Sequence, residues 1–382
     1  MVRIASFNVE NLFARPKAFN TSDWSIGRSV LNAYKKVNTL FSNPIYSVAD
    51  KQQILDLLVE LDIYYINSSG AIRRKRTKTY RWAWLRKNRG KFDRQPKDNT
   101  ESIQIVANGR EDWIGWVELA KEPINEIGTQ MTARVIRDVS ADIIGIVEAE
   151  DRPSLVWFNK ELLGGLYKHV MLVDGNDERG IDVGMMTRNN FEIESIRSNV
   201  DAEDSLGTVF SRDCPQYEVR TPSGAVIHVL VNHFKSQSGG GDQKRERQAA
   251  EVRRIVNNLV AQGQHVIVIG DLNEGPTAAG NQAENLSGLF NDDSPLVDCY
   301  WIPDFKIGNR PGTFNSCSLR NRFDYILISQ SLRLKFIGGG VFRRGLWGSR
   351  KTRPTAWNTY QNMTKSIEQA SDHAAVYFDL NI

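Results

Sequence analysis

The fold class follows from the stretch Val266-Ile267-Val268-Ile269-Gly270-Asp271-Leu272-Asn273. Its four leading residues are apolar and β-branched without interruption, which predicts a strand covered on both faces. A carboxylate and an amide follow, two positions apart. Residues at this spacing face the same side of a strand, so Asp271 and Asn273 can address one site. An Asx turn, in which both side chains cap their own backbone, is the alternative interpretation.

Four more apolar runs have the character of strands, at residues 143–147, 183–186, 226–231 and 325–328. Helical patterns alternate with some of these runs. One covers residues 124–139, and another covers residues 242–261 with apolar side chains at helical spacing. This alternation predicts an α/β protein with a substantial amount of sheet.

Polar side chains stand at or just past the carboxyl ends of these runs. Glu148, His233 and Asp271 each follow one of them. Side chains at strand ends are held by a rigid sheet and open into loops, where catalytic groups are both fixed and accessible. We therefore expect these three residues to share one rim of the sheet.

The composition is that of an ordinary globular protein. Of 382 residues, 41% are hydrophobic and 25% charged, so the chain can bury one large core or two modest ones. It has no apolar stretch near the roughly 18 to 20 residues that span a bilayer. Its three cysteines are too few for a disulfide framework or a zinc site. The first ten residues lack the pattern of a secretory leader, which favours a cytoplasmic location.

Residues 14–130 differ from the rest of the chain because they contain few signals of buried strands. We expect them to form a mainly helical or irregular insertion after the N-terminal strand. Between residues 73 and 97 there are twelve Lys or Arg and one acidic residue, Asp93, with Tyr80, Trp82, Trp84 and Phe92 among them. Such a tract can bind phosphate backbones and stack on bases. A solvated surface segment without a binding role is the alternative.

Two further acidic segments extend the candidate site. Ser371-Asp372-His373 places a hard oxygen ligand beside a titratable imidazole, just before a strand-like run. Asp324 stands at the edge of the run at 325–328, and such a carboxylate can hold a His ring in one orientation. We predict that Asp324 is the partner of His373. A purely structural role for the Asp-His pair is the alternative.

The residue types indicate hydrolysis at a metal centre. A carboxylate such as Asp271 can deprotonate an attacking water, and Asn273 can donate to a phosphate oxygen as its charge rises. His233 can protonate a leaving oxygen. Asn8 and Glu148 offer oxygen ligands without cysteine, which favours Mg²⁺, Mn²⁺ or Ca²⁺ over zinc.

The motifs follow one another in a recognisable order. They are Ser6-Phe7-Asn8, Ile146-Val147-Glu148, Asn232-His233, Gly270-Asp271-Leu272-Asn273, Arg322-Phe323-Asp324-Tyr325-Ile326 and Ser371-Asp372-His373. Together they resemble the endonuclease/exonuclease/phosphatase superfamily, which has the deoxyribonuclease-I-like fold. The resemblance covers about residues 1–13 and 131–382, where we expect the catalytic domain. It implies a four-layer α/β sandwich of two packed mixed β-sheets flanked by helices, with the active site at one end.

The resemblance also implies roles for the residues of the motifs. Glu148 resembles the principal metal ligand, with Asn8 and Asp372 in the same metal-binding corner. Asp271 resembles the residue that positions the nucleophilic water, and Asn273 the one that contacts the scissile phosphate. His373 resembles the residue that contacts the phosphate or activates the reaction there. Asp324 resembles the residue that orients this histidine.

Residues on the leaving-group side are implied in the same way. His233 matches a histidine that acts there in the nuclease and sphingomyelinase branches. The segment 177–183 resembles a motif that faces the substrate, so Arg179 is expected to bind a phosphate and Asp182 to orient His233. Lys235 is a further candidate for substrate binding.

The chain departs from the family pattern in one respect. Asn8 and Glu148 are separated by 140 residues, whereas a few tens are usual in the family. We therefore expect the insertion to emerge close to the metal corner, where it can shape the choice of substrate.

The sequence is best interpreted as a Mg²⁺- or Mn²⁺-dependent phosphodiesterase, most simply a nuclease. DNA is the first choice over RNA as substrate because the tract at 73–97 suits a polyanion, as does a second basic cluster, Arg343, Arg344, Arg350, Lys351 and Arg353. A phosphomonoesterase or a sphingomyelinase-like lipid phosphodiesterase on the same scaffold is the nearest alternative. A non-catalytic nucleic-acid-binding protein is a third.

Overall fold

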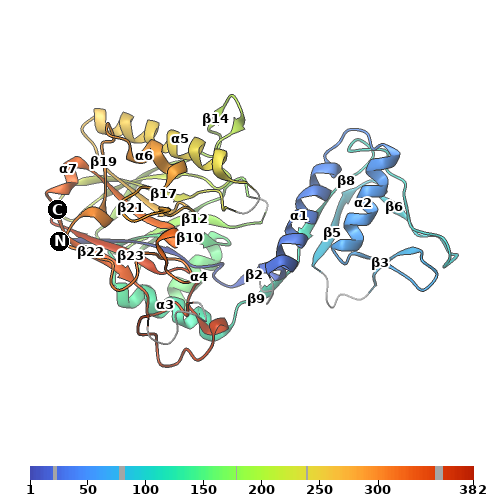
Figure 1. Cartoon of the computed structure of the whole chain (residues 1–382), viewed down its shortest axis with the longest axis horizontal. Helices are drawn as coiled ribbons and strands as arrows, with labels where there is room; N and C mark the ends of the chain where they lie inside the picture. Colours follow the sequence, from blue (N-terminus) through green and yellow to red (C-terminus); the bar gives the residue numbers. More distant parts are fainter. Residues whose placement is uncertain (20–23, 77–81, 178, 238–239, 349–355) are drawn as a thin grey trace. The chain divides into compact units, whose positions relative to one another are not determined.

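The computed structural model describes residues 1–19, 24–76, 82–177, 179–237, 240–348 and 356–382. Figure 1 shows their elements, which divide into two compact units. The sandwich unit comprises Met1–Phe13 and Ile124–Ile382, and the insertion unit comprises Ala14–Pro123. Residues 124–130 lie in the sandwich unit, because α3 (Glu126–Val139) begins there.

Two mixed sheets form the middle of the sandwich unit, with seven and six strands in the described residues. The first sheet has the order β11 (His169–Val173), β12 (Asp182–Thr187), β10 (Ile143–Ala149), β1 (Val2–Asn8), β23 (Ala375–Leu380), β22 (Phe336–Phe342) and β20 (Phe305–Lys306). The second has the order β13 (Glu192–Arg197), β16 (Gln216–Arg220), β17 (Val226–His233), β18 (His265–Asp271), β21 (Asp324–Ser329) and β19 (Leu296–Asp298). Strand β1 runs parallel to β10, and β17 runs parallel to β18.

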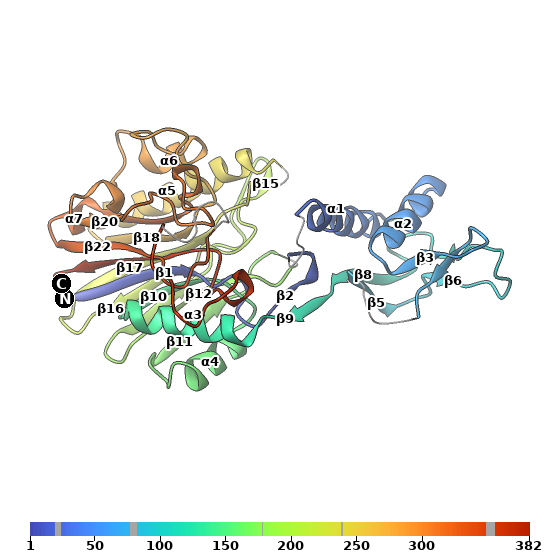
Figure 2. The same ribbon diagram turned by 60° about the horizontal axis from the view of Figure 1, so that its bottom comes forward.

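Helices cover the two outer faces of this pair of sheets. α3 and α4 (Arg152–Glu161) contribute to the apolar cluster on the first sheet. α5 (Asp242–Ala261) and α6 (Ser287–Phe290) contribute to the cluster on the second sheet. Figure 2 shows the resulting layers of helix, sheet, sheet and helix, which confirm the predicted four-layer α/β sandwich.

Short elements complete the sandwich unit. They are α7 (Gln330–Arg333), the two-stranded pair β14 (Glu203–Asp204) and β15 (Gly207–Thr208), and the 3₁₀ turns η2 (Glu284–Leu286), η3 (Cys299–Trp301), η4 (Leu319–Asn321) and η5 (Ser366–Glu368). These elements lie in the connections between strands.

Strand β18 is covered on both of its faces, which explains why residues 266–269 are all apolar. Val266 and Val268 pack with the helix side of the second sheet, whereas Ile267 and Ile269 pack against the first sheet. The two sheets approach each other closely at this point, because a Cβ added at Gly145 of β10 would lie 2.7 Å from Cδ1 of Ile269. The alternating side chains of one strand therefore belong to two different hydrophobic layers.

The insertion leaves and re-enters the sandwich unit at neighbouring residues. The backbone N–H of Ile124 donates to the carbonyl oxygen of Phe13 at 2.8 Å. Phe13 in turn donates its N–H to the carboxylate of Glu150 at 2.6 Å, just past the end of β10. Both ends of the insertion are thus fixed to one place in the sandwich.

Most described residues of the insertion unit are helical or irregular, as predicted, but the unit also contains short strands that the sequence did not indicate. Its described residues form α1 (Trp24–Phe41), α2 (Val48–Glu60), the turn η1 (Lys17–Phe19) and four two-stranded sheets. The strand pairs are β2 (Ala14–Pro16) with β9 (Lys121–Pro123), β3 (Tyr64–Ile66) with β4 (Ile72–Arg74), β5 (Ala83–Arg89) with β8 (Ile114–Leu119), and β6 (Asp93–Arg94) with β7 (Gln104–Ile105). Most of these strands have two or three residues, too few to show an alternating pattern.

The insertion unit has a hydrophobic core of its own. Trp113 is fully buried, with ring centroids 5.0 Å from Phe41 and 4.2 Å from Phe92. The hydroxyl of Tyr64 donates to the carboxylate of Asp93, which also accepts from Lys87 at 2.7 Å. Asp93, the single acidic residue of the basic tract, is therefore buried and holds these two side chains in place by hydrogen bonds.

Within the described ranges, none of the helices combines the length and apolar character that crossing a bilayer requires.

Gly270→Ala should destabilise the sandwich unit. Gly270 has a φ of +134°, and an added Cβ would lie 1.9 Å from the carbonyl oxygen of Asn232. We expect a loss of about 2 kcal/mol or more in the free energy of unfolding, measured by urea titration. Gly288→Ala is the control, since its Cβ would meet atoms no closer than 3.5 Å. Equal stability of the two variants would contradict this prediction.

Candidate active site

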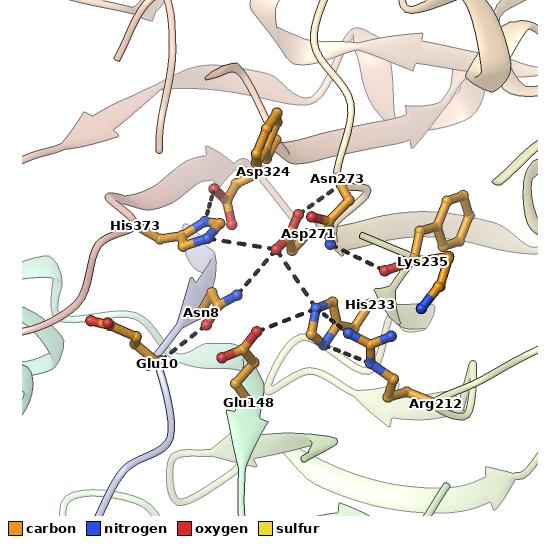
Figure 3. A network of polar contacts seen from close by, with 12 residues as sticks. Asn8, Glu10, Glu148, Arg212, His233, Lys235, Asp271, Asn273, Asp324 and His373 are labelled. Carbon is orange, nitrogen blue, oxygen red and sulfur yellow. Dashed lines mark hydrogen bonds and ion pairs between the residues drawn. The ribbon is translucent and has the colours of Figure 1, made fainter. Parts of the chain in front are cut away.

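Four polar side chains enter the space between the sheets at one end of the sandwich. Asn8, His233, Asp271 and Asp324 lie an even number of residues from the apolar side chains that their strands turn towards the opposite sheet. Because successive side chains of a strand alternate, all four face the same interior. All four are buried, and Figure 3 shows them converging.

Glu148 reaches the same place by a different route. It is one residue out of phase with Val147 of β10, so regular alternation would turn its side chain away from the interior. The pairing of β10 with β12 shifts between Val147 and Ala149, and Glu148 has a φ of +64°. This irregularity redirects the side chain, and Oε1 of Glu148 lies 3.4 Å from Nε2 of His233.

Asp271 is the centre of the cluster. Its Oδ2 accepts from the amide of Asn8 at 3.1 Å and lies 3.7 Å from Nε2 of His373 and 3.8 Å from Nε2 of His233. Its Oδ1 accepts the backbone N–H of Asn273 at 2.8 Å. The Asx turn, which the sequence offered as an alternative, is therefore present through Oδ1, while Oδ2 faces Asn8 and the two histidines.

His373 is held by Asp324, as predicted, with 2.8 Å between Nδ1 and Oδ2. Burial alone would lower the pKa of His373, but the carboxylates of Asp324 and Asp271 outweigh it and raise the pKa well above its ordinary value. Burial, together with the nearby Asp324 and Glu148, raises the pKa of Asp271. A protonated imidazole thus stands beside a carboxylate that binds a proton unusually well.

His233 has the opposite electrostatic environment. Burial and the cations Arg212 and Arg179 lower its pKa well below the ordinary value. Nε of Arg212 donates to Nδ1 of His233 at 3.2 Å, and Nη2 lies 2.8 Å from Nε2. The surroundings of His233 therefore favour its neutral form, whereas those of His373 favour its protonated form.

Arg212 was missed in the sequence. It is 2% exposed and lies 3.5 Å from Asp177, and its Nη1 has no hydrogen-bond partner among the described residues. Burial lowers the pKa of Arg212. An arginine among the polar residues 211–213 follows no motif that we used, so only the folded structure indicates its position.

The other residues proposed for substrate binding lie in different surroundings. Arg179 is paired with Asp177 at 2.6 Å, and Lys235 is half-buried at the margin of the cluster in Figure 3. The side-chain amide of Asn273 donates to the carbonyl oxygen of Phe234 at 3.1 Å. Asp182 does not orient His233, so that prediction was wrong. Its buried carboxylate instead accepts the N–H of Gly175 at 2.9 Å.

A corner rich in oxygen atoms lies beside Asn8. Its Oδ1 accepts the N–H of Glu10 at 3.0 Å, and Glu10 accepts the N–H of Asp372 at 3.0 Å. Glu10 is a second site residue that the sequence analysis did not identify, although it stands two positions after the N-terminal motif Ser6-Phe7-Asn8. The Asp372 carboxylate is 3.9 Å from Nε2 of His373.

The donors of this corner fit a hard cation. In the described part of the chain, no group of three His, Cys, Asp or Glu is arranged to enclose a metal ion. Mg²⁺ does not need such a cage, because it keeps several waters and uses one or two carboxylates together with substrate phosphate. Glu148 and Oδ1 of Asn8 can supply protein oxygens of this kind.

The basic tract is largely occupied by structural contacts. Arg73 donates to three backbone carbonyls, Arg74 pairs with Asp93, and Lys75 pairs with Asp62. Residues 77–81 of the tract lie outside the described residues. In the second basic cluster, Arg343 is buried and donates to backbone carbonyls, whereas Arg350, Lys351 and Arg353 lie outside the described residues.

Comparison with known families identifies the scaffold. The model of the endonuclease/exonuclease/phosphatase family matches residues 76–381, which is most of the chain. The chain belongs to this family. It is therefore a hydrolase of phosphoester bonds, and enzymes of this family generally depend on a divalent metal. A comparison with curated proteins gave no match.

Several solved structures are similar to this chain. The mannosyl-6-phosphatase Bt3783 of Bacteroides thetaiotaomicron is 18% identical, with a TM-score of 0.50 over 67% of this chain and 92% of that one. The catalytic domain of human Nocturnin is 18% identical, with a TM-score of 0.47 over 66% and 86%. Truncated TDP2 of Caenorhabditis elegans is 19% identical, with a TM-score of 0.45 over 66% and 90%. At 18% identity and a TM-score of 0.50, the first of these structures shows a likeness of the fold alone.

Asp324→Asn should lower the pKa of the His373 imidazole, because it removes the carboxylate that raises this pKa most. His373 then loses its proton at a lower pH than in the wild type, which NMR titration of the ring measures directly. We expect phosphoester hydrolysis to fall about tenfold to a hundredfold. Asp379→Asn, which breaks the remote ion pair with Arg3, is the control and should leave both quantities unchanged.

Proposed function

We propose that the chain is a Mg²⁺- or Mn²⁺-dependent phosphodiesterase that hydrolyses nucleic acid, with DNA as the first substrate to test. The observation that carries this proposal is the position of Oδ2 of Asp271, 3.7 Å from one imidazole and 3.8 Å from another. A diester needs a base for the attacking water and help for a poor alkoxide leaving group. Two imidazoles beside one carboxylate suit both tasks.

On the side of the attacking water, Asp271 acts as the base. Burial raises its pKa, and a carboxylate with a raised pKa takes a proton from water more readily. His373, held by Asp324, donates a hydrogen bond to a non-bridging phosphoryl oxygen. Its positive charge stabilises the negative charge that grows there in the transition state.

On the leaving-group side, His233 and Arg212 act together. The Nη1 of Arg212, without a partner among the described residues, is free to donate to a phosphoryl oxygen. The negative charge of the bound phosphate offsets the effect of Arg212 on the neighbouring imidazole. His233 can then take up a proton and pass it to the leaving oxygen.

A divalent ion held by Glu148 and Asn8 would neutralise charge on the phosphoryl oxygens. The protein side chains bind and orient the ester and move the protons. The charges of Arg179 and Lys235 lower the pKa of His233, which indicates that both cations lie near the site. Their positive charges therefore add to the attraction for an anionic ester.

Asp271→Asn and His373→Ala should each reduce cleavage of supercoiled plasmid DNA by at least about a hundredfold, because they remove the base and the charge that stabilises the phosphoryl oxygens. Nicked and linear DNA are measured on agarose gels with Mg²⁺ or Mn²⁺. His265→Ala, at the other end of β18, is the matched control and should cleave at the wild-type rate. Undiminished cleavage by both site variants would refute the site.

A substrate panel tests the class of ester. It contains plasmid DNA, linear DNA, RNA, a simple aryl diester and a monoester, each with Mg²⁺, Mn²⁺ or EDTA. We expect diester cleavage in either metal and none in EDTA. Turnover of the monoester alone would replace the proposed function with that of a phosphomonoesterase.

Glu148→Gln should raise the Mg²⁺ concentration needed for half-maximal activity by about tenfold to a hundredfold, because it weakens the principal oxygen ligand. The measurement is the rate of diester cleavage across a Mg²⁺ titration. Much of the activity should return at saturating Mg²⁺. An unchanged Mg²⁺ dependence would exclude Glu148 from the metal site.

A further inference from the structure

The charge of the chain is unevenly divided between its two units. Residues 14–123 contain 20 Lys and Arg and 12 Asp and Glu, a formal charge of +8. The sandwich unit contains the other 29 Lys and Arg and 33 Asp and Glu, a formal charge of −4. The whole positive balance of the protein is thus in the insertion unit, which is the part suited to a polyanion.

Strands β5 and β8 of the insertion unit form a two-stranded ribbon with two different faces. Ala83 and Val117 lie on the inner face, in the hydrophobic core that also contains residues of α1 and α2. Figure 2 shows both helices on one side of the ribbon. The neighbouring residues Trp84 and Trp116 must face the other way, because side chains alternate along each strand.

This outer face alternates aromatic and charged side chains. Arg86 stands directly opposite Trp116, and Trp84 stands opposite Glu118. After the register shift between Lys87 and Arg89, Arg89 pairs with Ile114 and so returns to the outer face. We call Trp84, Arg86, Arg89, Ile114, Trp116 and Glu118 the ribbon face.

Several side chains of the ribbon face are accessible to solvent. Trp116 is 45% exposed, so a large part of this aromatic side chain is accessible to a ligand. The side chains of Arg86 and Glu118 are 50% and 44% exposed, and they form an ion pair of 2.5 Å. Such an exposed pair contributes little to stability, so Arg86 can exchange its partner for a phosphate at small cost.

We propose that the ribbon face binds single-stranded nucleic acid, with a base stacked on Trp116 and phosphates paired with Arg86 and Arg89. Exposed aromatic rings beside cations on a strand surface suit a chain of alternating bases and phosphates. A duplex offers no free base to stack on such rings. The inference deepens the proposed function on which it rests, since it names the form of the nucleic acid.

Binding is tested on the full chain in EDTA, where a metal-dependent enzyme does not cleave the probe. The probes are fluorescein-labelled 20-nucleotide single strands and the matching duplex, followed by fluorescence anisotropy. Trp116→Ala should weaken binding of the single strand about tenfold. Trp157→Ala is the matched control, because Trp157 is 53% exposed on α4 of the sandwich unit. It should bind like the wild type.

The dependence of affinity on salt concentration distinguishes the contribution of phosphate contacts from that of base stacking. Arg89→Ala should make the logarithm of the affinity depend less steeply on the logarithm of the salt concentration, by about 0.7 for each lost phosphate contact. Trp116→Ala should leave this slope unchanged. Unchanged affinity of Trp116→Ala in a variant with wild-type circular dichroism would overturn the proposal. Tighter binding of the duplex than of the single strand would overturn it too.

The inference and the proposed function can fail separately. Trp116→Ala should hydrolyse a small aryl diester at the wild-type rate, whereas His373→Ala should lose diester turnover. Loss of binding in Trp116→Ala with no diester turnover in the wild type would refute only the phosphodiesterase. If the wild type hydrolyses the diester but Trp116→Ala binds the single strand like the wild type, only the proposed role of the ribbon face is refuted.

Discussion

The site depends on the alternation of side chains along strands that are buried between two sheets. In β18, Ile267 and Ile269 fill the interior of the sandwich, and the next interior position is Asp271. β17, β21 and β1 place His233, Asp324 and Asn8 in the same way at the same end. Polar groups taken out of water need partners, so the end of the hydrophobic interior becomes a network of hydrogen bonds and ion pairs. The shifted pKa values of Asp271, His233 and His373 have the same origin.

One residue of the site does not obey this alternation. Glu148 is directed inwards by a left-handed backbone conformation, which for a residue other than glycine costs about 1 to 3 kcal/mol. The carbonyl oxygen of Glu148 accepts the N–H of Asn11, which helps to hold the irregular turn. Glu10 and Asn273, also at the site, have φ values of 51° and 57°. Three of the non-glycine residues with positive φ thus lie where the polar side chains converge.

The sequence was sufficient for the features that depend on local pattern and on motif order. The apolar runs gave the strands at 143–147, 183–186, 226–231, 266–269 and 325–328, and the order of motifs indicated the fold and the pairing of Asp324 with His373. It could not show Arg212, because burial of a lone arginine depends on Asp177 and His233 from other strands and loops. The error over Asp182 has the same cause. The short strands of the insertion are stabilised by their shared core and carry little periodicity of their own.

The hydrogen bond between Phe13 and Ile124 has a consequence for the history of the chain. A segment of 110 residues begins and ends at adjacent points of the sandwich, so its presence leaves the path of every sheet strand unchanged. The entropy of closing such a loop also grows only slowly with its length. Sequence changes can therefore lengthen, replace or remove this segment as one unit without rerouting the strands that carry the candidate site.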